Sequence, residues 1–341
     1  METILLLVHV EPDGALAKPA LEALTAARSV QESIPGSSLA LGLVGNDAAA
    51  AATRIGSCGA ARFLAISGPG FALPRYASDA AAAEALCRAV EPTLVMAPAT
   101  SRWSRCLAGV TQRLNGRIDT HATGVGVDGG ELTVTRWYYR QRMEAAVRRS
   151  HRPWFILVDP GCHQPWAGAA ADVPVEALHF DLPEAARRTS FLEFREPQAD
   201  QQTIRPDAAL LFVAGAGWTK KQPDGKTHVE EAARLILDFV QKTQSSLGSS
   251  KSLVDLSGEG QAVLPFLTHM NQIGQTGSTP RHPKGLSTCC HGEEPHVVGW
   301  RFVTERRAVN LDPNCGWALG KADVLYVADA FEVLTQLLTL V

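Results

Sequence analysis

The first third of the chain alternates between short apolar runs and longer stretches rich in alanine and leucine. Thr3–Val10 is almost wholly apolar, which is typical of a strand covered on both faces of a parallel sheet. After a turn at Asp13-Gly14, Lys18–Val30 has the composition of a helix. The short connections between these alternating elements predict a doubly wound α/β sheet with right-handed crossovers. Repeats of the pattern predict strands at Leu39–Val44, Arg62–Ile66 and Thr93–Ala97, and helices at Asn46–Gly56, Ser78–Val90 and Ser101–Leu114.

The pattern changes after Gly116. The runs Glu131–Tyr139 and Trp154–Val158 are β-like, and we expect them to extend an edge of the same sheet. Residues 164–207 mix proline, glycine, alanine and charge, with one strand-like alternation at Phe191–Phe194. We therefore predict two α/β domains with doubly wound, mostly parallel sheets. They are a nucleotide-binding-like domain over residues 1–165 and a second domain over residues 207–341, joined by a linker over residues 166–206.

The second domain opens with a buried strand and closes with an apolar helix. Ala208–Ala214 is predicted to be that strand, and Val229–Gln244 carries apolar residues along one face of a predicted helix. Val324–Val327 predicts the last strand, and Ala330–Leu340 an amphipathic helix. The tail after Glu332 carries no charged side chain. We expect this apolar surface to be buried in its own domain or against another subunit.

The composition excludes several classes of protein. With 45% hydrophobic residues, 20% charged residues and a formal net charge of -3, the chain gives no support for the basic patch that a nucleic-acid surface needs. The seven cysteines are scattered and odd in number, which predicts a reducing compartment rather than a disulfide framework. No signal peptide and no apolar run long enough to cross a bilayer is recognised. We therefore expect a cytoplasmic protein that is not embedded in a membrane and does not bind nucleic acid.

The most specific chemistry of the chain begins at Met270–Gly277. Gln272, Gln275 and Thr276 have uncharged side chains that both donate and accept hydrogen bonds. The interleaved glycines, Gly277 among them, let the backbone turn tightly and approach a ligand closely. These residues suit a flat heterocycle edged with carbonyls and ring nitrogens.

Two polar residues further along the chain occupy positions that favour ligand binding, and a third favours helix capping. Asn310 and Asp312 are expected on the loop after a strand, where ligands of doubly wound folds bind. Asp329 opens the last predicted helix and is positioned to cap it with its carboxylate. The glycine-rich turn at Gly215–Gly217 is too short for the dinucleotide fingerprint, and no Walker loop or Ser-His-Asp triad is recognised.

The order of these residues resembles the alpha subunit of the electron-transfer flavoproteins. The pattern of that family runs Q-x-x-Q-T-G, S-G-x-x-Q-H, N-x-D-P and a closing V-A-D-L-F. This chain keeps the spacing of that pattern from Thr276 through His296 to Asn310. The resemblance covers nearly the full length, more loosely in the N-terminal half. It implies an FAD-binding second domain, and therefore an electron carrier rather than a substrate-converting enzyme.

The resemblance also implies which residues contact the cofactor. Gln275 and Thr276 correspond to family residues that hydrogen-bond the flavin. His296 corresponds to a histidine near the pyrimidine carbonyl of the ring, where a donor or cation stabilises negative charge on the reduced ring. The residues implied to bind FAD are Ser250, Lys251, Gln272, Gln275, Thr276, Gly277, His291, His296, Asn310, Asp312 and Asp329.

Three positions depart from the family pattern. Lys251 stands where the family has an arginine against the ring, so it keeps a cation but lacks the planar guanidinium. Trp218 follows Gly215–Gly217, where the family has G-G-R-G, and His291 replaces the serine of S-G-x-x-Q-H. These departures leave two alternatives open. One is a flavin-free structural or regulatory paralogue, and the other is an adenine-nucleotide-binding α/β protein without a redox role.

A metal site is a further alternative, because histidines and cysteines lie near these positions. The sequence has no C-x-x-C pair and no H-x-x-x-H helical spacing among them, which argues against zinc. Thiols beside a cofactor are the simpler interpretation. The residues concerned are Cys289, Cys290, His291, His296, His282 and Cys315.

The family resemblance implies three kinds of partner. The first is an electron-transfer flavoprotein beta subunit, paired with this chain in a heterodimer. The second is a flavin dehydrogenase that donates electrons, and the third is a membrane quinone oxidoreductase or another carrier that accepts them. The sequence leaves open which dehydrogenase serves the protein and whether electrons are bifurcated.

Overall fold

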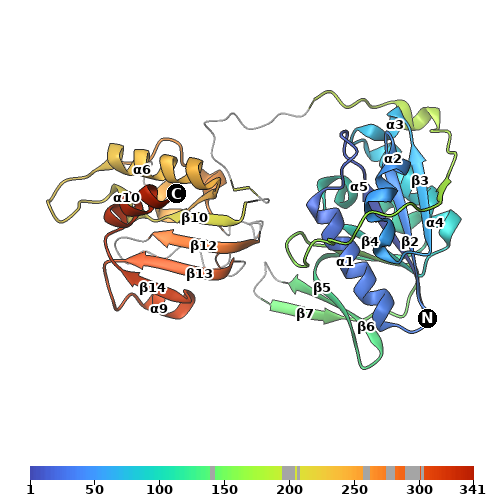
Figure 1. Ribbon diagram of the computed structural model, residues 1–341, viewed down its shortest axis with the longest axis horizontal. Coiled ribbons are helices and arrows are strands. Elements are labelled where there is room, and N and C mark those ends of the chain that lie inside the picture. The colour runs from blue at the N-terminus through green and yellow to red at the C-terminus, as the bar shows by residue number, and fades with distance from the viewer. Residues whose placement is uncertain are drawn as a thin grey trace. The chain divides into compact units, whose positions relative to one another are not determined.

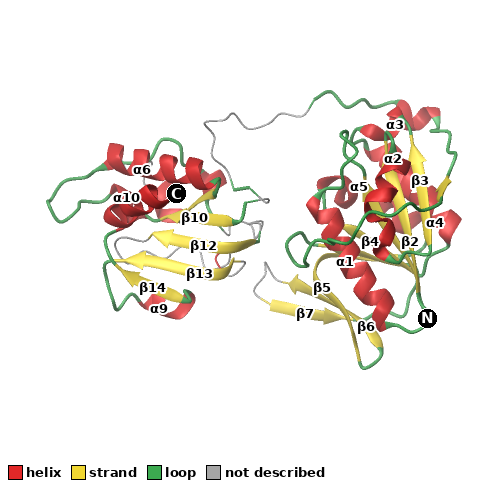
Figure 2. Cartoon of the chain, in the orientation of Figure 1, coloured by secondary structure: helices red, strands yellow, loops and turns green. Residues whose placement is uncertain are grey.

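The chain forms two compact units, Met1–Glu193 and Phe194–Val341, each built on its own sheet (Figure 1). The computed structural model describes residues 1–138, 143–193, 204–205, 208–255, 262–273, 281–288, 300 and 303–341. Strands are flanked by helices in both units (Figure 2), and the predicted two-domain α/β class is confirmed. None of the helices in the described part of the chain combines the length and the apolar character needed to cross a membrane.

The described part of the first unit contains a nine-stranded sheet in the order β7-β6-β5-β8-β4-β1-β2-β3-β9. The seven strands from β5 to β9 in that order pair in parallel, whereas β6 and β7 pair antiparallel at one edge. The continuous apolar runs of β1, β2 and β4 are buried, as expected for parallel strands covered on both faces. The strands are β1 (Thr3–His9), β2 (Ser38–Gly45), β3 (Arg62–Ser67), β4 (Leu94–Pro98), β5 (Arg117–Asp128), β6 (Glu131–Tyr138), β7 (Met143–Val147), β8 (Trp154–Val158) and β9 (Val175–Ala177).

Helices cover both faces of this sheet, which makes it doubly wound. One hydrophobic core contains the buried side chains of α1 and α2, and a second core contains those of α4 and α5. Alanines on these helices let them pack closely on the strands, which is why the predicted helices are so rich in alanine. The helices are α1 (Lys18–Ser33), α2 (Ala48–Ala52), η1 (Thr53–Cys58), α3 (Pro69–Ala72), α4 (Tyr76–Val90) and α5 (Ser101–Arg113), with η2 (Glu184–Arg187) later in the chain.

The edge extension is confirmed for one of the two β-like runs and wrong for the other. Glu131–Tyr138 forms β6, which lies between β5 and β7 at the antiparallel edge. Trp154–Val158 is β8, and it lies inside the sheet between β4 and β5 with all five residues buried. A short, wholly apolar run suits a strand that is covered on both faces, which explains why β8 lies inside the sheet.

A buried carboxylate joins the strands at this end of the sheet. Asp119 of β5 is 1% exposed. It accepts hydrogen bonds from Trp154 Nε1 at 2.9 Å, Arg136 Nη1 at 3.1 Å and Arg149 Nη2 at 2.9 Å. Burial opposes ionisation, but the hydrogen bonds from Arg149 and Trp154 outweigh it, and the pKa of Asp119 lies below its usual value. The carboxylate therefore connects β5 to β6, to β8 and to the segment before β8.

Much of the predicted linker lies on the first unit. Within it, β9 pairs in parallel with β3 at the edge of the sheet. The Trp166 N–H donates to the Leu21 carbonyl at 3.1 Å, and the Leu178 N–H donates to the Ala65 carbonyl at 2.8 Å. Such isolated backbone contacts produce no periodic pattern of side chains, so the sequence of this region looks irregular although it is attached.

The strand predicted at Phe191–Phe194 is not found in its described part. Residues 191–193 have irregular backbone, and Leu192 is 90% exposed. Alternation of apolar and polar residues predicts a strand only where one face becomes buried. This prediction is therefore wrong for those three residues.

The described residues of the second unit form a five-stranded sheet in which every pairing is parallel, in the order β11-β10-β12-β13-β14. Helices α6 and α10 share the core on one face, and Trp300 and Trp317 pack in the core of the other. The strands are β10 (Leu210–Ala214), β11 (Ser246–Ser249), β12 (His282–Thr288), β13 (Val303–Asn310) and β14 (Val324–Val327). The helical elements are η3 (Ala216–Thr219), α6 (Val229–Thr243), α7 (Lys251–Asp255), η5 (His269–Asn271), α9 (Gly316–Lys321) and α10 (Ala330–Leu340).

The apolar C-terminal helix packs within its own unit. Leu334 is fully buried, and α10 lies against α6. Lys242 Nζ of α6 donates to the carbonyls of Leu338 at 2.9 Å and Val341 at 3.1 Å, which satisfies acceptors at the end of α10. The sequence allowed this helix to pack in its own domain or against another subunit. In the structure it packs in its own domain, although Leu340 remains 79% exposed.

Candidate functional site

The carboxyl ends of the second sheet share one edge, because all five strands run in the same direction. The chain leaves β10 toward β11 on one side and returns to β12 on the other side of β10. Such a reversal opens a crevice outside the carboxyl ends of the strands, and this is where doubly wound folds bind ligands. The side chains at this edge are therefore the candidate site.

The residues after β11 begin a short helix at this edge. The Ser250 hydroxyl accepts a hydrogen bond from the Leu253 N–H at 3.3 Å, and the Ser250 N–H donates to the Ala214 carbonyl at 2.9 Å. Ser250 is fully buried, whereas Lys251, the first residue of α7, is exposed. The structure thus places both predicted residues beside the carboxyl end of β11. Their contact with a cofactor stays a prediction.

Gln272 is held at the same edge by its backbone. It forms a parallel bridge with Ser249, and the N–H of the next residue, Ile273, donates to the Ser249 carbonyl at 3.2 Å. The preceding turn is fixed by a capping box between Thr268 and Asn271. Gln272 is 8% exposed. Gln275, Thr276 and Gly277, which complete the predicted motif, lie outside the described residues.

Asn310 is the last residue of β13 and turns the chain at the sheet edge. Its Oδ1 accepts a hydrogen bond from the Asp312 N–H at 2.9 Å, and Asp312 Oδ1 accepts one from the Asn314 N–H at 2.8 Å. These successive side-chain-to-backbone bonds fix a polar loop directly after the strand. Asn310 is 1% exposed and Asp312 is exposed. Asp312 follows the strand as predicted, whereas Asn310 is the last residue of the strand itself.

Two buried polar atoms at this edge lack a partner among the described residues. They are the Ser249 hydroxyl oxygen and Asn310 Nδ2. A buried polar group without a hydrogen bond costs about 1–3 kcal/mol, so natural structures rarely retain one that no ligand or water satisfies. Three strand spacings separate β11 from β13, which corresponds to about 14 Å at the usual distance between neighbouring strands. Each of the two atoms is therefore a candidate hydrogen-bonding position for a ligand at this edge.

Asp329 caps the last helix. Its Oδ1 accepts hydrogen bonds from the Phe331 N–H at 2.8 Å and the Glu332 N–H at 3.3 Å. The predicted capping role is therefore confirmed. A cofactor contact from the same carboxylate stays a prediction.

Trp218, one of the positions that depart from the family pattern, is a core residue. Its side chain is fully buried, and its ring centroid lies 4.6 Å from that of Phe331. Its indole Nε1 donates to Thr288 Oγ1 at 2.8 Å, and that hydroxyl donates to the Val213 carbonyl at 2.9 Å. Trp218 therefore joins β10, β12 and α10 and fills the interior at the point where the sheet order reverses.

Ser249 is a candidate site residue that sequence reasoning missed, and Thr288 ends β12 in the same way. Both are fully buried polar residues at the carboxyl ends of strands. The available signal was a serine or threonine closing a strand, but such residues also end strands for purely structural reasons, as the Thr288 hydroxyl does here.

The described part of the chain contains no group of three or more His, Cys, Asp or Glu that could hold a metal ion. His282 lies in β12 with its Nε2 at 2.9 Å from the Ser246 hydroxyl and 3.0 Å from the Arg205 carbonyl, so its role is structural. Cys315 is buried. Cys289, Cys290, His291 and His296 lie outside the described residues.

Two stacked rings lie at the corresponding edge of the first sheet. His9 ends β1 and stacks on Trp103 of α5, with ring centroids 3.8 Å apart and planes at 16°. Burial, followed by the charge of Arg102, holds the pKa of His9 well below its usual value, so the imidazole is neutral. This uncharged pair of rings therefore lies at the carboxyl end of β1, the strand at which the order of the first sheet reverses.

Comparisons with known proteins relate this chain to one family. A family model described as "Electron transfer flavoprotein domain" matches residues 4–183, more than half of the chain. The chain is 24% identical over 331 residues to the protein named "Electron transfer flavoprotein subunit alpha" from Thermoanaerobacterium thermosaccharolyticum. That match covers 96% of this chain and 94% of that protein, and so extends over both units.

A second relative is the protein named "Protein FixB" from Azotobacter vinelandii. The chain is 25% identical to it over 240 residues, which covers 67% of this chain and 60% of that protein. Both identities are low, but the first match is nearly complete in length, and the family model covers most of the first unit. The chain is therefore a divergent member of the electron transfer flavoprotein family, on the side of its alpha subunits.

Proposed function

We propose that this chain binds FAD in its second unit and carries electrons as the alpha-type subunit of an electron transfer flavoprotein. The observation that carries the proposal is the pair of buried, unpartnered polar atoms on Ser249 and Asn310 at the carboxyl edge of the second sheet. Family membership makes a flavin the ligand class that suits them. The isoalloxazine supplies the redox chemistry when it is bound, and the protein supplies position and electrostatics.

The residues at this edge offer complementary contacts to such a cofactor. Asn310 Nδ2 donates to a ligand acceptor, and the Ser249 hydroxyl donates or accepts. Gln272 brings a neutral amide to the same end of β11, and Lys251 brings a positive charge that favours negative charge on the ligand. Gln275, Thr276, Gly277, His291, His296, Asp312 and Asp329 complete the proposed set.

The proposed partners follow from the family. A beta-type subunit pairs with this chain, a flavin dehydrogenase donates electrons, and a membrane quinone oxidoreductase or another carrier accepts them. We propose that this electron transfer takes place in the cytoplasm. In this scheme the chain converts no substrate of its own.

Removing either unpartnered atom is expected to weaken FAD binding. Ser249→Ala should do so without destabilising the cofactor-free protein, whereas Asn310→Ala also removes the oxygen that accepts from the Asp312 N–H. Ser249→Ala and Asn310→Ala each remove one hydrogen bond to the ligand, so each raises the dissociation constant about tenfold. Because Ser249→Ala also removes a buried hydroxyl that lacks a partner, the free energy of unfolding of the cofactor-free protein stays equal or rises. Fluorescence titration of cofactor-free protein with FAD, and urea unfolding of the same samples, measure the two effects.

Asn314→Ala is the matched control. Asn314 is exposed on the loop after β13, and only its backbone N–H has a role in that loop. Its FAD affinity is expected to equal that of the unmodified chain. Equal affinity in the Ser249, Asn310 and Asn314 variants would remove the carboxyl edge from the proposed site.

A further inference from the structure

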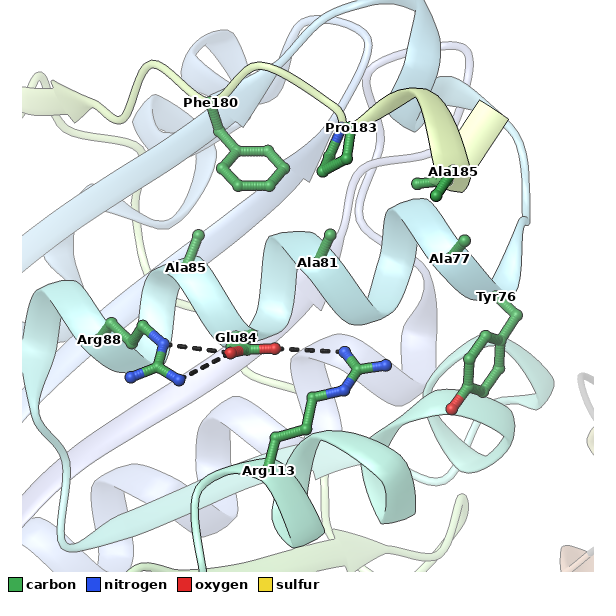
Figure 3. A pocket seen from close by; sticks show the side chains of 11 residues that line it. Tyr76, Ala77, Ala81, Glu84, Ala85, Arg88, Arg113, Phe180, Pro183 and Ala185 are labelled. Carbon is green, nitrogen blue, oxygen red and sulfur yellow. Dashed lines mark hydrogen bonds and ion pairs between the residues drawn. The ribbon is translucent and has the colours of Figure 1, made fainter. Parts of the chain in front are cut away.

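A groove on the first unit takes no part in the candidate site or in the proposed function. It has a volume of about 620 Å³ and lies between α4, the end of α5 and residues 180–186. Figure 3 shows its lining, with Phe180 and Pro183 above α4 and with Glu84 and Arg113 below it. Its volume is within the range of small-molecule sites, about 300–1,000 Å³.

The groove exists because α4 presents small side chains on its outer face. Ala77, Ala81 and Ala85 recur every fourth residue and are partly buried, whereas the opposite face of α4 packs in the core. Leu182 and Ala186 of the neighbouring segment are buried against that core and hold the segment beside α4. The alanines thus form a flat apolar floor under the segment.

Two arginines and one carboxylate line the polar side. Glu84 Oε1 accepts hydrogen bonds from Arg88 Nε at 3.1 Å and Nη2 at 2.8 Å, and Glu84 Oε2 accepts one from Arg113 Nη1 at 3.2 Å. Two guanidinium groups on one carboxylate leave one net positive charge. The side chains of Arg88 and Arg113 are 62% and 46% exposed, whereas Glu84 is 22% exposed. With five N–H donors on each guanidinium, both arginines keep donors for an anion.

Aromatic rings line the groove as well. Phe180 is partly buried over the alanine floor, and Tyr76, at the start of α4, is 42% exposed. The Tyr76 hydroxyl lies over Gly109 of α5, where a Cβ atom would approach it to 2.4 Å. Because Gly109 has no side chain, the Tyr76 ring can pack against α5 beside the groove.

We propose that this groove binds an aromatic monocarboxylate. Its carboxylate accepts hydrogen bonds from the guanidinium donors of Arg88 and Arg113 that Glu84 leaves unused, and its single charge balances the net positive charge of the three side chains. The flat body lies on Ala81 and its neighbours and contacts Phe180 and Tyr76, since aromatic pairs add stabilisation to the burial of apolar area. The proposal does not depend on a flavin in the second unit.

The test is equilibrium dialysis of the full chain, as purified, against 2-naphthoate. Saturable binding is expected, and the double substitution Arg88→Gln with Arg113→Gln should weaken it at least tenfold, because two charged hydrogen-bonding partners are lost. Arg28→Gln is the matched control. Arg28 pairs with Glu32 on α1 with the same spacing that Glu84 and Arg88 have on α4.

Two further arms separate the charge from the apolar floor. Naphthylmethylammonium, which has the same ring system and the opposite charge, should bind at least tenfold more weakly than 2-naphthoate. Ala81→Leu should fill the floor and abolish binding, while far-UV circular dichroism checks that the variant is folded. The proposal is overturned by any of three results: no saturable binding of 2-naphthoate, equal binding in the double arginine variant, or equal binding of the cation.

Discussion

Replacing Trp218 by alanine is expected to lower the free energy of unfolding of the second unit by about 3–5 kcal/mol, the cost of truncating a fully buried large aromatic side chain. The indole contacts Phe331 and donates to Thr288. Its loss therefore leaves a cavity in the core and leaves the Thr288 hydroxyl oxygen without the indole donor. Thr288 keeps its bond to the Val213 carbonyl, which limits the polar part of the loss. Urea unfolding followed by circular dichroism measures the change.

Trp218→Phe separates packing from hydrogen bonding. It keeps an aromatic ring against Phe331 and removes the donor to Thr288, so a smaller loss of about 1–2 kcal/mol is expected. A Trp218→Ala protein as stable as the unmodified chain would mean that this tryptophan does not fill the interior where the sheet order reverses.

Replacing Asp119 by asparagine is expected to lower the free energy of unfolding of the first unit by about 3–5 kcal/mol, because it breaks a buried ion pair from one side. The amide leaves the guanidinium groups of Arg136 and Arg149, which are 21% and 35% exposed, beside a neutral side chain near the start of β5. Asp128→Asn is the control. That carboxylate is 79% exposed and pairs with Arg148 on the same antiparallel extension, so its loss should cost less than about 1 kcal/mol.

The pH dependence of the Asp119 effect has a defined sign. The pKa of Asp119 is lower in the folded protein than its usual value, so folding favours the ionised form. Its stabilisation is therefore complete above the unfolded-state pKa of about 3.9 and is lost as the pH falls through the folded-state pKa. The stability difference between the unmodified chain and Asp119→Asn should stay constant from pH 7 to about pH 4 and shrink below it. A difference that grows on acidification would contradict the ion-pair assignment.

The sequence predicted the elements of the fold best where burial leaves a periodic pattern. Thr3–Val10 and Lys18–Val30 are accurate to a few residues as β1 and α1, because one is a continuous apolar run and the other is a helix facing a core. Residues 166–178 are attached to the first unit by the three-residue strand β9 and by single backbone hydrogen bonds, such as that from the Trp166 N–H to the Leu21 carbonyl. No side-chain pattern encodes such bonds.

The candidate site was predictable where a residue acts through its own local chemistry. Asp329 caps a helix that begins directly after it, and Asn310 ends a strand and turns the chain, so both roles are readable from neighbouring residues. The position of Ser249 beside Gln272 depends on the pairing of segments more than twenty residues apart. Trp218 looked like an altered ligand position, and only the packing of β12 and α10 around it shows that it is part of the core.

The most direct test of the central claim is to denature the purified chain, together with any partner that co-purifies with it, and to identify and quantify the released cofactor. The proposed function predicts close to one FAD per chain, with the Ser249→Ala and Asn310→Ala proteins releasing less of it than Asn314→Ala. Release of an adenine nucleotide without flavin, or of no cofactor from well-folded protein, would contradict the assignment of this chain as a flavin-binding electron carrier.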